Sequence, residues 1–209
     1  MAVHDPGISQ ELAQKIMKLN FFGIEEAARY LQVTPTRNQR HPVIECTERQ
    51  LYKMRDTHIL VADFGLSVLD IRSRVQRELF SLKARSGYDG EEFATQRDTP
   101  NWRLVRKLPV KNSPGATWDE QQDLLAEDEE TPTARIMVYT IIGHFLHVGE
   151  RLFEAMYVRC SDKHTDGRRV RVGYFDIEGL GFSGDEDGSR VCDVGLGSVW
   201  KKRKDVVLS

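Results

Sequence analysis

The sequence predicts an α+β fold in which N-terminal helices and a central apolar helix pack on a small, mainly antiparallel sheet with a C-terminal hairpin. Three observations favour this fold. Apolar residues recur at helical spacing in the N-terminal region. The segment from Pro132 to Glu154 is apolar on nearly all sides. After residue 155, apolar residues occur at every second position, which is the spacing of a strand. We expect a helical N-terminal segment at 1–55 and an α+β domain at 56–209, or else one continuous domain.

The N-terminal segment is predicted to contain three helices. Ser9 is placed to cap a helix at 10–19, and a second, shorter helix follows at 24–31. Thr47 and Gln50 have the spacing of a capping box, in which each side chain accepts a hydrogen bond from the other residue's backbone. A third helix is therefore expected to begin there.

The next stretch predicts two strands separated by a helix and a loop. The apolar run 58–64 is typical of a buried strand, and 67–80 carries the apolar stripe of a helix. Residues 82–100 are polar and contain glycine, so we expect a long surface loop. The strand expected at 101–110 contains Pro109, which lacks a backbone N–H and therefore belongs at a sheet edge or a strand end.

The central helix is predicted to run from Pro132 to about Glu154, after a shorter helix at 117–126. Thr131 is the expected N-cap, and proline suits the first helical position. The acidic run 127–130 lies just before it, where the positive end of the helix dipole stabilises negative charge. Because apolar side chains cover nearly its whole circumference, we expect the remainder of the molecule to be assembled around this helix.

The C-terminal region is predicted to be a hairpin followed by one more strand. Residues 155–161 and 168–175 alternate with period two, and Asp166-Gly167 between them is a favoured turn pair. A glycine-rich acidic loop then leads to a last strand near 190–200.

Composition limits the classes of function. The formal net charge is −2, so nucleic acid or an anionic membrane would need a local basic patch. Cys46, Cys160 and Cys192 are odd in number and widely spaced, unlike the cysteines of a secreted disulfide scaffold. The N-terminus has no signal-peptide pattern, and the apolar segment 136–148 is too short to span a membrane. We therefore expect a cytoplasmic protein with no membrane partner and no cofactor.

The predicted hairpin carries the strongest candidate site. Tyr157 and Arg159 fall on one face of its first strand, and Arg169 and Arg171 alternate onto one face of its second. Arginine beside aromatic residues can bind phosphate and stack on bases. The predicted binding residues are Tyr157, Arg159, Arg168, Arg169, Arg171, Lys201, Lys202, Arg203 and Lys204. We predict a non-enzymatic interaction protein that binds nucleic acid or a protein partner here, although a solvated sheet face paired with nearby acids explains the same residues.

The alternative function is a small enzyme or a metal-binding protein. His144, His147 and Glu150 are spaced at i, i+3 and i+6 on the central helix, so the two histidines share a helix face. No Cys-x-x-Cys or His-Glu-x-x-His pattern supports a zinc site, and Cys160 lies on the expected core side of its strand. The structural explanation is that these histidines are exposed or hydrogen-bonded where the helix reaches solvent.

Residues 57–200 resemble a group of uncharacterised bacterial proteins. The resemblance is carried by segments 56–62, 102–107, 117–122, 130–144, 149–154 and 157–162. No activity is established for that group, so the resemblance implies no catalytic residue.

Overall fold

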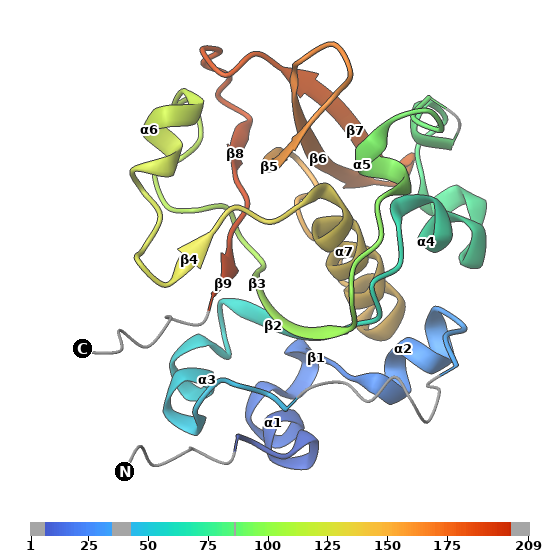
Figure 1. Ribbon diagram of the computed structural model, residues 1–209, viewed down its shortest axis with the longest axis vertical. Coiled ribbons are helices and arrows are strands. Elements are labelled where there is room, and N and C mark those ends of the chain that lie inside the picture. The colour runs from blue at the N-terminus through green and yellow to red at the C-terminus, as the bar shows by residue number, and fades with distance from the viewer. Residues whose placement is uncertain (1–6, 35–42, 86, 202–209) are drawn as a thin grey trace.

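Two β-sheets contact a single long helix, α7 (Ala134–Val148), which lies between them (Figure 1). The structure is a computed structural model that describes residues 7–34, 43–85 and 87–201. The predicted α+β class is confirmed. The small sheet expected from the sequence is in fact two sheets, each of them mixed.

The three predicted N-terminal helices are present, and two of them begin where their capping residues predict. They are α1 (Gln10–Met17), α2 (Ile24–Tyr30) and α3 (Glu48–Met54), with a 3₁₀ turn at Lys18–Asn20 after α1. Ser9 Oγ accepts a hydrogen bond from the Leu12 N–H at 3.3 Å, and Thr47 Oγ1 accepts one from the Gln50 N–H at 3.3 Å. These caps are local in sequence, which is why the pattern alone locates them.

The first sheet includes a strand from the N-terminal segment. In spatial order its strands are β1 (Phe21–Phe22), β2 (His58–Asp63), β3 (Asn101–Arg106), β9 (Val199–Trp200) and β4 (Glu129–Glu130). β1 runs parallel to β2 and the other pairs are antiparallel, so β1 joins the predicted N-terminal segment to the predicted α+β domain. β3 is the middle strand and ends before Pro109, so the proline marks a strand end and not a sheet edge.

The second sheet contains the predicted hairpin and one strand that the sequence analysis missed. In spatial order its strands are β7 (Gly179–Asp185), β6 (Arg169–Asp176), β5 (Tyr157–Lys163) and β8 (Val194–Leu196). β5 and β6 pair antiparallel, and Gly167 in their turn has φ 86°, as the Asp-Gly pair predicts. The region expected to be a glycine-rich loop includes β7, whose glycine at 181 pairs with Gly173 of β6.

Helix α7 is shorter than predicted but as deeply buried. It is 15 residues long, and its N-cap is Thr133, not Thr131. It ends at Gly149, whose φ of 77° is the left-handed conformation that terminates helices, so the helix does not continue to Glu154. Every residue from Ala134 to His144 is buried. The prediction that the molecule is assembled around this segment is confirmed by its contacts with both sheets and with α2 and α4.

Glu129, one of the four residues of the acidic run before α7, has a different role from the one predicted for that run. Glu129 lies in β4 and is buried, with its Oε1 atom 3.7 Å from His58 Nε2 and 3.3 Å from Arg106 Nε. Burial opposes ionisation of this carboxyl, but His58 and Arg106 outweigh it and lower the pKa of Glu129 to about 2. Its charge therefore stabilises the first sheet, not the helix dipole.

Residues 82–100 are not a long surface loop, and that prediction is wrong. Helix α4 (Val68–Arg74) is followed by 3₁₀ turns at Arg77–Leu79 and Lys83–Arg85 and by α5 (Glu92–Thr95). Tyr88 and Phe93 are buried, and the Tyr88 hydroxyl donates to the Phe182 carbonyl of β7 at 2.9 Å. The segment thus covers the outer edge of the second sheet, and it positions α5 beside the hairpin turn.

Candidate functional site

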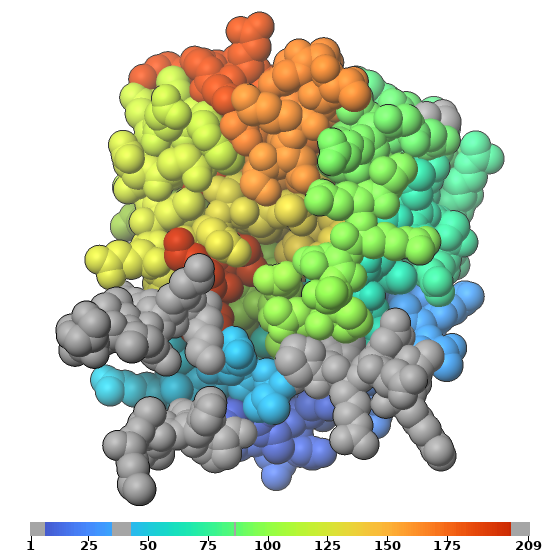
Figure 2. Space-filling model, in the orientation of Figure 1, coloured from blue at the N-terminus to red at the C-terminus, as the bar shows by residue number. Residues whose placement is uncertain are grey.

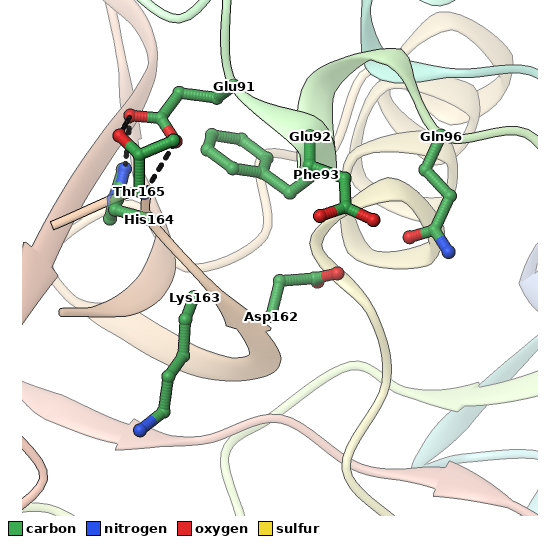
Figure 3. Close-up of a pocket in the computed structure, with 8 residues that line it drawn as sticks. All are labelled: Glu91, Glu92, Phe93, Gln96, Asp162, Lys163, His164 and Thr165. Atoms are coloured by element: carbon green, nitrogen blue, oxygen red, sulfur yellow. Dashed lines mark hydrogen bonds and ion pairs between the residues drawn. The ribbon is translucent and has the colours of Figure 1, made fainter. Parts of the chain in front are cut away.

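An open pocket of about 350 Å³ lies between α5 and the turn of the β5–β6 hairpin. One wall comes from residues 91–93 and 96, and the other from residues 162–165 (Figure 3). Figure 2 shows these two parts of the chain side by side on one face of the molecule. The volume is within the range of about 300–1,000 Å³ that is usual for small-ligand sites.

The two walls are joined by polar contacts around Glu91. Its carboxylate accepts hydrogen bonds from the Thr165 backbone N–H at 2.9 Å and the Thr165 hydroxyl at 3.2 Å, and it lies 3.5 Å from His164 Nδ1. His164 is buried, and its Nε2 atom donates to the Ser183 carbonyl at 3.2 Å, because a carbonyl can only accept. The ring of Phe93 packs edge-on against the imidazole at 5.2 Å. These contacts join the two walls of the pocket.

Asp162 lies at the start of α7. Its Oδ2 atom accepts a hydrogen bond from the Ala134 N–H at 2.5 Å, which is one of the helix N-terminal donors that have no acceptor within the helix. Burial raises the pKa of Asp162 above 3.8, although the Ala134 N–H works in the opposite direction. The ionised carboxylate is therefore incompletely compensated, and an additional positive charge would stabilise it.

Glu92 and Gln96 lie opposite Asp162. Figure 3 shows the Glu92 carboxylate and the Gln96 amide directed toward the Asp162 carboxylate, whereas Lys163 points away. The Lys163 Nζ atom lies 3.1 Å from Asp187, which accounts for its direction. Within the described part of the chain, the side chain of Glu92 has no hydrogen-bond or ion-pair partner. The pocket thus presents two carboxylates and an amide, with no cation directed between them.

Arg159 was predicted on the hairpin surface, and this prediction is wrong because the side chain is fully buried. Its Nη2 atom donates to Asp185 at 2.5 Å, and its Nη1 atom donates to Gln121 Oε1 at 3.1 Å. Gln121 belongs to α6 (Trp118–Gln122), which lies over this end of the sheet. Strand alternation places Arg159 on the outer face, but it cannot reveal that a segment 38 residues earlier covers that face.

Two further arginines of the predicted face are neutralised by aspartates. Arg169 is nearly buried, donates to both carboxylate oxygens of Asp187 at 3.0 Å, and has its guanidinium carbon 3.6 Å from the centre of the Trp118 ring. Arg168 is exposed and pairs with Asp166 at 2.7 Å. The predicted basic face therefore carries much less uncompensated charge than its sequence suggests.

The remaining predicted residues have mixed positions. Tyr157 and Arg171 are half-buried on the outer face of the second sheet, with the guanidinium 4.8 Å from the ring centre. Lys201 is exposed. The other predicted basic residues, which are Lys202, Arg203 and Lys204, lie outside the described residues.

The structure does not bring His144, His147 and Glu150 together as a ligand set. His144 is buried and its Nε2 atom lies 2.8 Å from Glu150 Oε2, while burial lowers the pKa of His144 below 6.5 against the effect of Glu150. The ring of His147 lies instead against Phe22 and Tyr30, at 6.4 and 6.1 Å. No group of three or more His, Cys, Asp or Glu residues in the described ranges is arranged to hold a metal ion.

All three cysteines are free. Cys160 is buried in the core, as predicted, and burial raises the pKa of its thiol well above 9. Burial also raises the pKa of Cys46 to about 12, so neither thiol is activated as a nucleophile. Cys192 is exposed.

Sequence reasoning missed Glu92, Gln96 and Asp162 as site residues. Glu92 and Gln96 lie in the stretch interpreted as a surface loop, and Asp162 falls in the connection between the two predicted hairpin strands. The hydrogen bond between Glu91 and Thr165 spans 74 residues, so no local pattern indicates that the two walls meet. The adjacent acids at 91 and 92 are the one signal in this stretch, and such pairs are common on solvated surfaces.

No family model, no curated protein and no solved structure matches this chain. Among the residues that the structure describes, no helix combines the length and the apolar character needed to cross a membrane. The pocket and the hairpin must therefore be interpreted from their own chemistry.

Proposed function

We propose that the protein is a non-enzymatic binding protein that holds a positively charged group of its ligand, an ammonium or a guanidinium, between Glu92 and Asp162. The observation that supports this is the pair of carboxylates facing each other across an open pocket into which no cation is directed. The hairpin remains the binding element, as the sequence analysis expects, but the binding surface is its acidic turn.

A cation in the pocket has a clear electrostatic benefit. It compensates the charge of Asp162, whose ionised form is destabilised by burial, and it gives the Glu92 carboxylate its first partner. Each charge-assisted hydrogen bond contributes about 1.5–3 kcal/mol. The Gln96 amide oxygen can accept a further hydrogen bond from the same group.

The lining residues favour binding over catalysis. Both ring nitrogens of His164 face partners, the Ser183 carbonyl and the Glu91 carboxylate, so the imidazole is not free to act as a general base. The Thr165 hydroxyl donates to Glu91 and is likewise engaged. The enzyme alternative that uses His144 and His147 is supported by one histidine–carboxylate contact only.

We also place the protein in the cytoplasm. This proposal is supported by its three free cysteines, since thiols stay reduced in that compartment.

The test is a calorimetric titration of the full chain with butylamine and butylguanidine, compared with butanol and butyrate, which have the same carbon chain without the positive charge. Short peptides that carry one lysine or one arginine, titrated in parallel, distinguish a protein partner from a free amine. We expect both cations to bind and the neutral and anionic probes not to bind. Glu92→Gln is expected to weaken binding about tenfold or more.

Glu178→Gln is the matched control, because Glu178 is also exposed but lies in another turn. It removes the same charge and is expected to leave the affinity unchanged. Equal binding of butanol and butylamine, or an equal effect of the two substitutions, would contradict the proposal.

Asp162→Asn separates binding from folding. The pKa of Asp162 is higher in the folded chain than its unfolded value near 3.8. At a pH between these two pKa values, the folded state binds more protons at this residue than the unfolded state does. The contribution of Asp162 to the free energy of unfolding therefore falls as pH rises through this range. Asparagine can accept the same N–H from Ala134 and carries no charge. We expect loss of cation binding with a free energy of unfolding at neutral pH that is equal to wild type or higher, as measured by urea unfolding. A loss of stability would show that Asp162 serves the fold.

A further inference from the structure

The outer face of the hairpin keeps one arginine that has no acidic partner. The other three arginines of the hairpin each pair with an aspartate, whereas Arg171 forms no ion pair within the described ranges. Its Nη2 atom donates only to the Ser183 hydroxyl at 3.3 Å, and the guanidinium lies against the Tyr157 ring. The positive charge of Arg171 is therefore held in a fixed direction without being neutralised.

Two glycines shape the surface beside Arg171. In the sheet register Tyr157 lies opposite Gly173, and Gly173 lies opposite Gly181. A Cβ atom on Gly181 would lie 3.1 Å from the Tyr157 hydroxyl oxygen, and one on Gly173 would lie 2.1 Å from the Met156 carbonyl oxygen. The Tyr157 ring therefore reaches across β6 toward β7, where the two glycines leave room for it.

Tyr174 is held beside Tyr157 by a strained backbone. Its φ is 45°, which a bulky residue rarely adopts, and the register of β6 shifts between Gly173 and Asp176. This irregularity brings the ring of Tyr174 to 4.7 Å from that of Tyr157, and the Tyr174 hydroxyl donates to Asp193. The ring of Tyr174 is half-buried on the outer face, and the same register shift turns the next residue, Phe175, into the core. Strain of this kind concentrates at functional surfaces.

We infer that Tyr157, Arg171 and Tyr174, which we call the tyrosine–arginine cluster, form a docking site for an acidic segment of a partner protein. A carboxylate of that segment accepts hydrogen bonds from the Arg171 guanidinium, and the apolar groups beside it pack on the two tyrosine rings. Tyrosine and arginine are the residues that most often dominate binding energy at protein interfaces. This inference is independent of the cation pocket, because it rests on different residues and on the opposite charge.

The charge distribution favours a protein partner over nucleic acid. Binding to a phosphate backbone requires several uncompensated cations, but the formal net charge of the chain is −2 and the neighbouring arginines are neutralised. One uncompensated arginine matches one carboxylate.

The test is fluorescence anisotropy of the full chain with a labelled pool of short peptides in which glutamate alternates with leucine, phenylalanine and tyrosine. A second pool has lysine in place of glutamate. We expect the glutamate pool to bind and Arg171→Gln to weaken its binding about tenfold or more. Arg168→Gln is the matched control, since it removes the same charge from an exposed position on the same hairpin, and it is expected to have no effect.

Tyr174→Asn distinguishes a docking role from a structural one. Asparagine tolerates the positive φ of this position but has no ring to pack against a partner. We expect weaker binding of the glutamate pool with an unchanged or higher melting temperature. A fall in melting temperature without an effect on binding would overturn the inference.

Three other results would also overturn it. The first is equal binding of the lysine pool. The second is displacement of the glutamate pool by a short single-stranded oligothymidine that binds more tightly, which would indicate a nucleic-acid surface. The third is a dimer in sedimentation velocity that Arg171→Gln dissociates, which would indicate that a second copy of this chain covers the cluster.

Discussion

Arg159 and Arg171 are direct cross-strand neighbours on the same face of one sheet, yet their environments differ in nearly every respect. Arg159 is fully buried, pairs with Asp185, and donates to three further residues, Ala116, Gln121 and Ser189. Arg171 is half-buried and has a hydroxyl and an aromatic ring as neighbours. The difference arises because α6 lies over one end of the sheet and leaves the other end open. Strand periodicity therefore sets the face of an arginine, and coverage by distant segments decides whether it stabilises the fold or remains available for binding.

The largest effect is expected at the covered end. Arg159→Ala leaves Asp185 buried without its cation, and breaking such a pair destabilises by about 3–5 kcal/mol. Urea unfolding followed by circular dichroism measures this loss. The double variant Arg159→Ala with Asp185→Ala should recover part of it, because no uncompensated charge then remains. A loss below about 1 kcal/mol would show that water reaches this end of the sheet, and the contrast with Arg171 would disappear.

The same contrast explains which elements of the fold could be predicted. Caps at Ser9, Thr47 and Thr117 join residues three positions apart, so the local pattern is sufficient to locate α1, α3 and α6. Strand β7 and the buried segment around Tyr88 depend on each other across the chain, because the tyrosine hydroxyl hydrogen-bonds to Phe182, 94 residues away. Glycine-rich and polar composition predicts a loop, and the sequence does not show the distant partner that makes each of these two segments ordered or buried.

The candidate site was less predictable than the fold for the same reason. The alternation of apolar and polar residues and the Asp166-Gly167 pair correctly predict the hairpin and its turn. Tyr157 and Arg171 lie on its outer face, as predicted. The cation pocket was missed because Glu92 and Asp162 come from elements that meet only in three dimensions. Arg159 was wrongly predicted as a surface binding residue, because the sequence does not show that Asp185 lies beside it.

An intermediate effect is expected at Arg169, which is covered on one side only. Arg169→Gln removes a bidentate pair with the partly exposed Asp187 and the stacking on Trp118, a loss of about 1–2 kcal/mol. The emission of Trp118 should also change, because its ring loses the guanidinium above it. Trp118→Phe serves as the control, since it removes this signal but retains the ion pair. An unchanged emission spectrum would indicate that the stacked arrangement is not maintained in solution.

The smallest effect is expected at Arg171, and it is the most informative about the comparison. Because this side chain is half-buried and has no ion pair in the described ranges, Arg171→Gln should change the free energy of unfolding by no more than about 0.5 kcal/mol. The measurement is the same urea unfolding that is applied to Arg159→Ala, so the two neighbours are compared directly. A loss similar to that of Arg159 would mean that Arg171 holds β6 and β7 together through Ser183. The open end of the sheet would then be structural, like the covered end. A small loss of free energy of unfolding in Arg171→Gln would show that the charge of Arg171 is not needed for folding. A residue that serves docking must meet this condition.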